Sequence, residues 1–429
     1  MHLQETSKAI RNFPFPDIMQ KSFLQAILII KKHAANANLL LKKLSKEEHQ
    51  DILSITDDLI KNFDLSLFPL SIYQTGSGTS SNMNINEVIS SKTKLQLHPN
   101  DKINLSQSSN DVIPTAIRIS CVLEVENSLF PVLDYLKNEL SKKIELSHLL
   151  IKSGKTHLMN ATPISFAQVF SGYKYQVELF EERLRNCLIR LKELPQGGTA
   201  VGTGINTHKE FASHFIASLN TSLKQNFTET KNHFEAQSMI NAPLELSSCL
   251  KDFCTSLIKI LTDLRLMNSD GGFKEITLTP LQAGSSIMPG KVNPVLEEAL
   301  TMMCLQIIGF DTANTMANAL GNFELNTFLP LVGQNLLKSL ELLSLGLHQW
   351  IKLSFSTLTI LESSIKAKLE NNPIILTALN PLLGYEKVAS IIKKAEKENR
   401  RFKDILLEET NLTEKDLEEL LNPTKLIYP

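Results

Sequence analysis

Apolar side chains recur at helical spacing over most of the chain. Near the N-terminus Phe23, Ile27, Ile30 and Ala34 follow a period near 3.6 residues, which predicts an amphipathic helix. The run Ser45-Lys-Glu-Glu then has the pattern of a capping box and predicts the start of a second helix. We therefore expect residues 1 to about 70 to be helical.

Four longer helical patterns follow. They cover residues 115 to about 150, about 164–194, 294 to about 318, and 330 to about 353. Pro131 lies inside the first of them and predicts a kink. A helix of thirty residues is about 45 Å long, more than one small domain requires, so these patterns favour a bundle that other subunits complete. Possible short strands near 196–206 and 273–279 are the exceptions to an all-α fold.

Changes in composition divide the chain into three segments. Residues 1–107 are expected to form an N-terminal helical domain that ends in a polar stretch rich in Gly, Ser, Thr and Asn. Residues 108–358 are expected to form the central long-helix domain. From about residue 359 the turn signals at 371–373 and 380–381 separate shorter helices, so residues 359–429 are expected to be a small C-terminal helical domain.

Charge and cysteine usage narrow the class of protein. Lys plus Arg number 44 and Asp plus Glu 45, a balance that argues against nucleic-acid or membrane-surface binding. The five cysteines are scattered without a CxxC pair, which favours reduced thiols. The chain opens with no charged-then-apolar signal and contains no stretch long enough to span a membrane, so we expect a cytoplasmic protein. The dispersed histidines predict no metal site.

The most distinctive polar stretch is residues 284–298, GSSIMPGKVNPVLEE. Its glycines and prolines predict a mobile loop before a helix that Pro294 begins. The loop offers hydroxyls, a cation and an amide, and the first turn of the helix adds carboxylates. Together these groups suit the binding of a small anion and the transfer of a proton. Each residue taken singly would fit an ordinary surface loop before a capped helix.

Four further polar stretches adjoin the apolar helical patterns. They are residues 75–82, residues 98–111, residues 154–157 at the head of a predicted helix, and residues 197–206. Backbone N–H groups beside glycines and small donors before a helix suit a carboxylate. Flexible turns, N-capping by Ser109 or Asn110, a packed or surface His157, and a tight backbone connection are the structural alternatives. The 197–206 stretch lacks the strand and the acidic residue of a dinucleotide fingerprint.

These stretches resemble the fumarase/aspartase superfamily, and most closely the class II fumarate hydratases. The likeness is carried by residues 74–88, 98–115, 154–168, 197–208, 284–294, 321–326 and 377–387. It implies an all-α homotetramer with a central twenty-helix bundle and active sites built from three subunits each. It also implies reversible hydration of fumarate to L-malate, a dicarboxylate reaction that uses no metal and no organic cofactor.

The resemblance assigns roles residue by residue. Ser285 would be the base, and His157, oriented by Glu298, would handle the water that is added or lost. The substrate-binding residues would be Ser77, Gly78, Thr79, Ser108, Ser109, Asn110, Thr156, Ser286, Lys291, Val292 and Asn293. A second dicarboxylate site would be formed by His98, Pro99, Asn100 and Asp101.

Two other functions stay open at this point. Residues 281–283 and 332–334 are closer to aspartases, so an ammonia-lyase acting on aspartate or a related amino acid is the nearest alternative. Residues 268–273 replace a run in which the family carries an arginine, and residues 95–97 are uncharged where many relatives are basic. These departures suggest a catalytically silent tetrameric scaffold as the third possibility.

Overall fold

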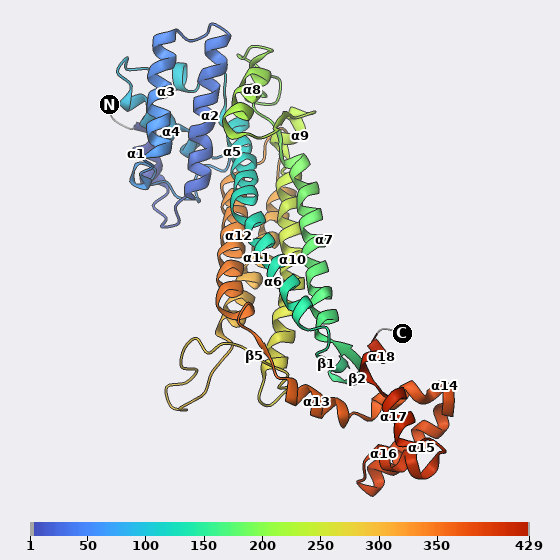
Figure 1. Cartoon of the computed structure of the whole chain (residues 1–429). Helices are drawn as coiled ribbons and strands as arrows, with labels where there is room; N and C mark the ends of the chain where they lie inside the picture. The colour runs from blue at the N-terminus through green and yellow to red at the C-terminus, as the bar shows by residue number, and fades with distance from the viewer. Residues whose placement is uncertain (1–3, 428–429) are drawn as a thin grey trace. The chain divides into compact units, whose positions relative to one another are not determined.

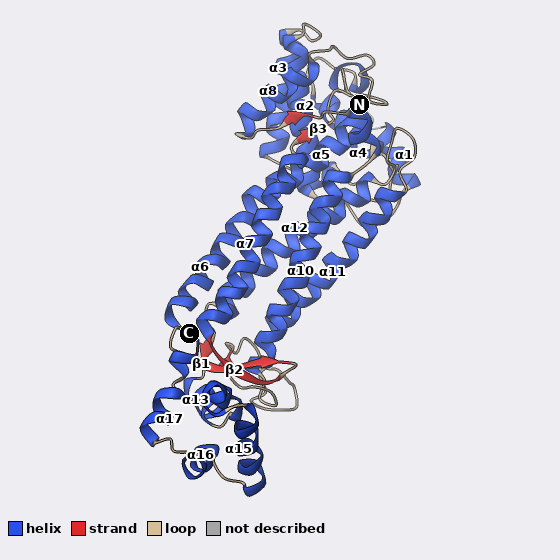
Figure 2. Cartoon of the chain, turned by 90° about the vertical axis from the view of Figure 1, so that its right-hand side faces the viewer, coloured by secondary structure: helices blue, strands red, loops and turns tan. Residues whose placement is uncertain are grey.

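The structure, a computed structural model, describes residues 4–427. Helices dominate this part of the chain, and its strands form three two-stranded sheets (Figures 1 and 2). The all-α fold class is therefore confirmed. The chain divides into two compact units: unit 1 holds residues up to 133, 179–257 and 300–347, and unit 2 holds residues 134–178, 258–299 and 348 onward. The three segments expected from composition remain a prediction.

Unit 1 contains the N-terminal helices. Its elements are α1 (Gln4–Asn12), α2 (Lys21–Leu40), α3 (Lys46–Lys61), a 3-10 turn (Leu65–Leu67), α4 (Thr79–Lys92), a π-helical turn (Pro99–Ile103), α5 (Ser109–Glu124), a second π-helical turn (Val125–Leu129), β3 (Glu193–Leu194), α8 (Phe211–Leu223), β4 (Thr228–Glu229) and α9 (His233–Ser238). Five long helices have residues in both units: α6 (Phe130–Leu146), α7 (Phe166–Leu191), α10 (Asn241–Asn268), α11 (Val295–Ala319) and α12 (Leu329–Trp350).

The predicted N-terminal helices are confirmed. Phe23, Ile27, Ile30 and Ala34 are fully buried on α2, which packs against α3, α5 and α8. Ser45 caps α3: its hydroxyl accepts from the backbone of Glu48, and the Glu48 carboxylate accepts from the backbone of Ser45. Both halves of the capping box are therefore present.

The polar stretch before residue 115 contains a helix that the sequence pattern did not predict. Helix α4 is buried although it carries Asn82, Asn84 and Asn86. Asparagine disfavours a helix interior because its side chain competes for backbone partners. Here the asparagine amides bond to other segments instead: Asn84 donates to Thr6 and to the backbone of Leu67. Tertiary hydrogen bonds thus outweigh the local preference.

The first long helix begins earlier than predicted. It starts at Ser109 rather than at residue 115, with Pro114 inside its early turns. The helical path then continues through a π-helical turn into α6, and Phe130 N–H donates to Val125 O across that turn. Pro131 lacks an N–H and its ring crowds the preceding turn. The irregularity expected at Pro131 therefore takes the form of a π-helical turn just before it.

Unit 2 contains the remaining small elements. They are β1 (Ile151–Thr156), β2 (Met159–Ser165), β5 (Ile276–Thr277), a π-helical turn (Ile351–Phe355), β6 (Thr359–Ile360), α13 (Glu362–Glu370), a 3-10 helix (Pro373–Leu379), α14 (Asn380–Leu383), α15 (Tyr385–Glu398), α16 (Phe402–Glu409), α17 (Glu414–Leu420) and α18 (Pro423–Ile427). Strands β5 and β6 pair antiparallel, Ile276 opposite Ile360, which confirms the strand predicted near 273–279.

Two other predictions of local structure were wrong. Residues 196–206 form successive turns rather than a strand. Residues 154–157 do not head a helix: they belong to the antiparallel hairpin β1–β2, and α7 begins only at Phe166. Strand β1 pairs Thr156 with Met159, so His157 and Leu158 form the two-residue turn.

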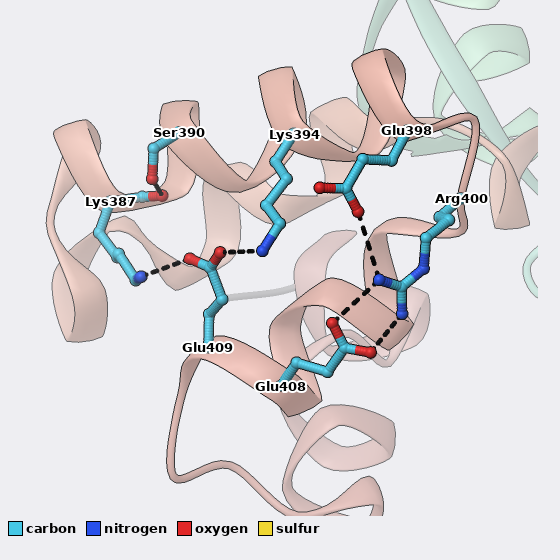
Figure 3. A network of polar contacts seen from close by, with 7 residues as sticks. All are labelled: Lys387, Ser390, Lys394, Glu398, Arg400, Glu408 and Glu409. Carbon is cyan, nitrogen blue, oxygen red and sulfur yellow. Dashed lines mark hydrogen bonds and ion pairs between the residues drawn. The ribbon is translucent and has the colours of Figure 1, made fainter.

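The C-terminal helices have an apolar core of their own. Leu376, Leu379, Ile391, Ile405 and Leu406 are fully buried in it. On the surface, Lys387 and Lys394 of α15 form ion pairs with Glu409 of α16, and Arg400, between the two helices, pairs with Glu408 (Figure 3). This part of unit 2 is thus held both by apolar packing and by charges at its surface.

Candidate functional site

In unit 1 the start of α5 is shaped by its capping residues. Ser108 caps the helix: its hydroxyl accepts from Asn110 N at 3.2 Å, and its own N–H donates to Asp111 Oδ1 at 2.9 Å. The helix is therefore capped, but by Ser108 and not by Ser109 or Asn110, the residues weighed from the sequence. The side chains of Ser109 and Asn110 take no part in the capping box that Ser108 and Asp111 form. The positive end of the helix dipole lies beside them, a favourable place for an anion.

The 197–200 turn is tied to this helix start. Asp111 is fully buried, and its Oδ2 accepts from Gly197 N and Thr199 N, both at 3.0 Å. Asn110 Nδ2 donates to Ala200 O at 2.7 Å. Burial raises the pKa of Asp111, while the three backbone N–H groups oppose that shift. Two of the predicted polar stretches therefore meet at one place.

The loop before α4 joins the same place. Ser77 and Thr79 share a hydrogen bond between their hydroxyls at 3.0 Å. Gly78 has φ +75°, and a Cβ there would lie 2.8 Å from Ile113 on α5, so the position requires glycine. The segments 77–79 and 197–200 therefore both lie beside the start of α5 within unit 1.

In unit 2 His157 lies at the tip of the β1–β2 hairpin. Both turn residues are left-handed, with φ +53° at His157 and +61° at Leu158. Such a turn matches the twist of a two-residue hairpin but usually selects Asn or Gly. Thr156 and His157 are exposed. The tight turn therefore presents an imidazole to the outside at a cost in backbone strain.

The base of this hairpin is held by a buried carboxylate. Glu275, next to β5, forms ion pairs with Lys152 and, at 2.9 Å, with Lys155. Burial lowers the pKa of Lys152, and Glu275 counteracts that shift. The segment that leads towards residue 284 is therefore attached to the strand that leads to His157.

The 284–293 loop contains the predicted base. Ser285 Oγ accepts hydrogen bonds from two backbone N–H groups, Ile287 at 3.2 Å and Met288 at 3.1 Å. The loop borders a hollow of about 370 Å³ whose lining includes Ser285, Lys291 and Val292. Ser286, Lys291 and Val292 are exposed. The loop therefore presents a cation and a hydroxyl that two N–H groups polarise.

Asn293 and Glu298 have partners within their own chain. Asn293 Nδ2 donates to Gly284 O at 3.0 Å and Gly284 N donates to Lys291 O at 2.8 Å, so the two ends of the loop are joined. Glu298 lies 3.4 Å from Arg265. Over residues 4–427 the structure gives no hydrogen bond or ion pair between His157 and either Ser285 or Glu298. The role expected for Glu298 therefore remains a prediction that involves another subunit.

The residues expected at a second dicarboxylate site lie together. His98, Pro99, Asn100 and Asp101 occupy the start of a π-helical turn, and His98 Nδ1 lies 3.0 Å from Asp101 Oδ2. His98 and Asp101 are exposed. His98 Nδ1 also accepts from the backbone N–H of Asp101 at 3.2 Å and so caps its own turn, and the role of these residues at a second dicarboxylate site stays a prediction.

Two asparagines that were not predicted as site residues lie behind Ser109. Asn82 Nδ2 donates to Ser109 Oγ at 3.0 Å and to Asn104 Oδ1 at 3.2 Å. The signal available in the sequence was the alternation of asparagines with apolar residues in 82–88. In a helix, asparagines four apart share a face.

No described helix combines the length and the apolar character needed to cross a bilayer. Between residues 4 and 427, no group of three or more His, Cys, Asp or Glu side chains is arranged to hold a metal ion.

Comparison with known proteins agrees with this arrangement. Residues 4–309 match the lyase family, and residues 375–428 match the fumarase C C-terminus. The chain is 44% identical to fumarate hydratase class II of Xylella fastidiosa, covering 98% of this chain and 91% of that protein. It is 41% identical to fumarate hydratase class II 2 of Pseudomonas aeruginosa, covering 98% and 94%.

Solved structures give the same result for the fold. A class II fumarase from Schistosoma mansoni superposes with a TM-score of 0.94 at 33% identity, covering 99% of this chain and 95% of that one. A fumarate lyase:delta crystallin from Brucella melitensis, bound to cobalt, gives the same TM-score, identity and coverage. With its long-helix fold and its polar stretches in the family's order, the chain belongs to the class II fumarate hydratases.

Proposed function

We propose that this chain catalyses the reversible hydration of fumarate to L-malate with Ser285 as the base. In the dehydration direction a base takes a proton from the carbon next to a carboxylate, and the bonding electrons move onto that carboxylate. The C–O bond then breaks, and the hydroxyl leaves as water with a proton from an acid. Such a reaction needs a base, an acid, and donors where negative charge develops.

The observation that carries this assignment is the environment of Ser285 Oγ. A serine hydroxyl is a poor base unless its alkoxide is stabilised. The N–H groups of Ile287 and Met288 both donate to this oxygen. Hydrogen bonds to the charged form of a group lower its pKa, so these donors favour the alkoxide. Lys291, in the same loop, adds a positive charge that favours the same form.

We assign the acid to His157 and the binding of the dicarboxylate to polar segments that different subunits supply. An imidazole changes charge near neutral pH and suits transfer of a proton to the departing water. Three of the proposed dicarboxylate-binding residues lie on exposed segments: Thr156, Lys291 and Asn293. The other three lie at a helix start that favours anions: Ser108, Ser109 and Asn110. The catalytic cycle is complete when Ser285 has released its proton to solvent and His157 has taken up a new proton.

We further propose that the active site is completed in a homotetramer. The long helices leave apolar side chains uncovered in unit 1: Met302, Leu305 and Met316 on α11 are each more than half exposed, as are Ile189 on α7 and Leu345 on α12. Exposed apolar surface of this kind favours burial against other copies. A native mass near four times 48.0 kDa is expected. Location in the cytoplasm and work in the tricarboxylic acid cycle fit this function.

The test is turnover of L-malate, followed by the ultraviolet absorbance of fumarate, with aspartate as the competing substrate. Ser285→Ala should reduce kcat by about 100-fold or more, the usual contribution of a general base, and leave the tetramer intact. Ser390→Ala, on α15, should retain activity because its hydroxyl contacts only Lys387 O among the described residues. Fumarate formed only from aspartate, or full activity in Ser285→Ala, would contradict the proposal.

A further inference from the structure

The polar residues behind Ser109 form a continuous chain that begins at a buried lysine. Lys31, on α2, is 1% exposed. Its ammonium donates to Asn104 Oδ1 at 2.8 Å and to Gln107 Oε1 at 3.0 Å. Asn82 Nδ2 donates to the same Asn104 oxygen and to Ser109 Oγ. A lysine on one helix is thus connected through two amides to the hydroxyl at the start of another.

The direction of every hydrogen bond in this chain follows from the lysine. An ammonium group only donates, so Asn104 must turn its oxygen towards Lys31. The Asn104 amide nitrogen donates to Gln107 O at 3.1 Å, which is consistent with that orientation. Because the Asn104 oxygen accepts, Asn82 must present its NH₂ group. The same NH₂ group reaches Ser109 Oγ, which therefore accepts.

Ser109 is thereby left with its own proton free to donate elsewhere. The opposite orientation of Asn82 would let its oxygen accept from Ser109 and would turn the serine proton inward. In the orientation found, Asn82 Oδ1 is buried and has no hydrogen-bond partner among the described residues. An unpaired buried amide oxygen costs free energy. The lysine-directed chain therefore holds Ser109 in its donating state against a local preference.

We propose that Lys31 is a positioning residue that keeps Ser109 as a hydrogen-bond donor to a substrate carboxylate. The inference rests on the proposed function, in which Ser109 binds the dicarboxylate. Burial lowers the pKa of Lys31 to about 7, and Asp111 counteracts part of that shift. The neutral amine still carries two hydrogens for its two oxygen partners, so the direction of the chain is the same in either protonation state.

A purely structural lysine would behave differently. Its removal would lower stability, because a cavity would remain and Gln107 Oε1 would lose its hydrogen-bond donor. It would not change the affinity for substrate in molecules that still fold. The ratio of the change in KM to the change in kcat therefore separates the two roles.

The experiment compares Lys31→Met, Lys31→Arg and the control Lys32→Met in the full tetramer. Lys31→Met should raise KM for fumarate and for L-malate by about tenfold, the factor expected for one hydrogen bond to a charged group, with a smaller fall in kcat. Lys31→Arg keeps a group that only donates and should recover part of the loss. Lys32 pairs with Asp57 on the next helix. Its replacement should leave KM unchanged.

A second variant acts on the same chain without touching the lysine. In Asn82→Asp the ionised carboxylate only accepts, so the Ser109 proton should turn inward and KM should rise as in Lys31→Met. The double variant Lys31→Met/Ser109→Ala should have the KM of Ser109→Ala alone, because both changes remove the same donor. If Lys31→Met does not fold, Asn82→Asp and its combination with Ser109→Ala decide the question.

A normal KM in folded Lys31→Met would overturn the inference. So would effects of the Lys31 and Ser109 changes on KM that multiply, because independent effects mean two separate donors. Neither result would contradict the proposed function as long as the unchanged chain turns over fumarate. If the unchanged chain turns over no fumarate, the proposed function fails. The inference is then tested by the rise in Tm that fumarate produces: an equal rise in the unchanged chain and in Lys31→Met overturns it, and a smaller rise in the variant supports it.

Discussion

Glu409 shows how much the environment of a single carboxylate changes its chemistry. On α16 it accepts hydrogen bonds from Lys387 and Lys394 on α15, both at 2.7 Å (Figure 3). The two ammonium groups lower the pKa of Glu409 to about 2. The folded-state pKa thus lies below the unfolded value of 4.5. Its contribution to stability is present above about pH 4.5 and is lost as the pH falls towards 2.

We expect Glu409→Gln to lower the unfolding midpoint of the C-terminal helices by no more than a few degrees at pH 7, because the carboxylate is exposed to solvent. The difference from the unchanged chain should disappear as the pH falls from 4.5 to 2. Hydrogen exchange in α15 and α16 at several pH values measures it. Glu396→Gln, an exposed carboxylate on α15 without an ion pair among the described residues, should show no such trend. A difference that persists at pH 2 would contradict the assignment.

For single residues, the sequence indicated which residue types belong to the candidate site but not which groups they form hydrogen bonds with. The stretch 284–298 stood out because serine, lysine and asparagine are concentrated in a short segment that also contains two glycines and two prolines. The positions of the two N–H groups that bond to Ser285 could not be predicted from the sequence, since they depend on the loop conformation. The chain from Lys31 to Ser109 was not predictable, because it joins residues that are 78 positions apart in the sequence.

The β1–β2 hairpin illustrates strain at the scale of an element. An L-residue in the left-handed region costs about 1–2 kcal/mol, and both His157 and Leu158 are in that region. The Leu158 side chain is 62% exposed, so packing offsets little of this cost. The pairing of β1 with β2 therefore holds the hairpin tip in a strained conformation that presents His157.

We expect Leu158→Gly to be about 1 kcal/mol more stable than Leu149→Gly, since glycine relieves the strain only at position 158. Leu149 is also exposed and does not have a positive φ. Urea unfolding of both variants gives the comparison. Equal stability of the two variants would show that the turn is not strained.

The elements were predictable wherever one apolar face decides the fold. Helix α2 follows its period because Phe23 and Ile27 must be buried together. Helix α4 was missed because hydrogen bonds from its asparagines to other segments stabilise it, and the sequence shows no clear apolar stripe there. The hairpin was missed because residues 154–157 were assigned to the start of the helix that follows, whereas they belong to a hairpin in which β1 pairs with residues beyond the tight turn at His157 and Leu158.

At the scale of the whole molecule the proposed tetramer makes a quantitative prediction. The Ser285→Ala and His157→Asn chains should each be inactive alone. If one active site takes Ser285 and His157 from different subunits, random assembly of equal amounts leaves both residues intact in about one quarter of sites, one half times one half.

Co-expression of the two variants, followed by malate turnover per tetramer, measures this recovery. Mixing intact tetramers without subunit exchange is the control and should give none. Co-assembled tetramers that stay as inactive as their parents would place both residues in a site built from a single chain.

The joined ends of the 284–293 loop have a consequence for the entropy of binding. The free energy needed to bring the ends of a flexible loop together rises with the logarithm of its length. Here hydrogen bonds between Gly284, Lys291 and Asn293 already hold the ends of the loop together. Ligand binding therefore does not require the free energy of loop closure again. A substrate then has to order only the tip around Met288 and Gly290. Lengthening the tip beside Gly290 would leave the joined base closed, so its cost should be limited to the extra residues that binding must order.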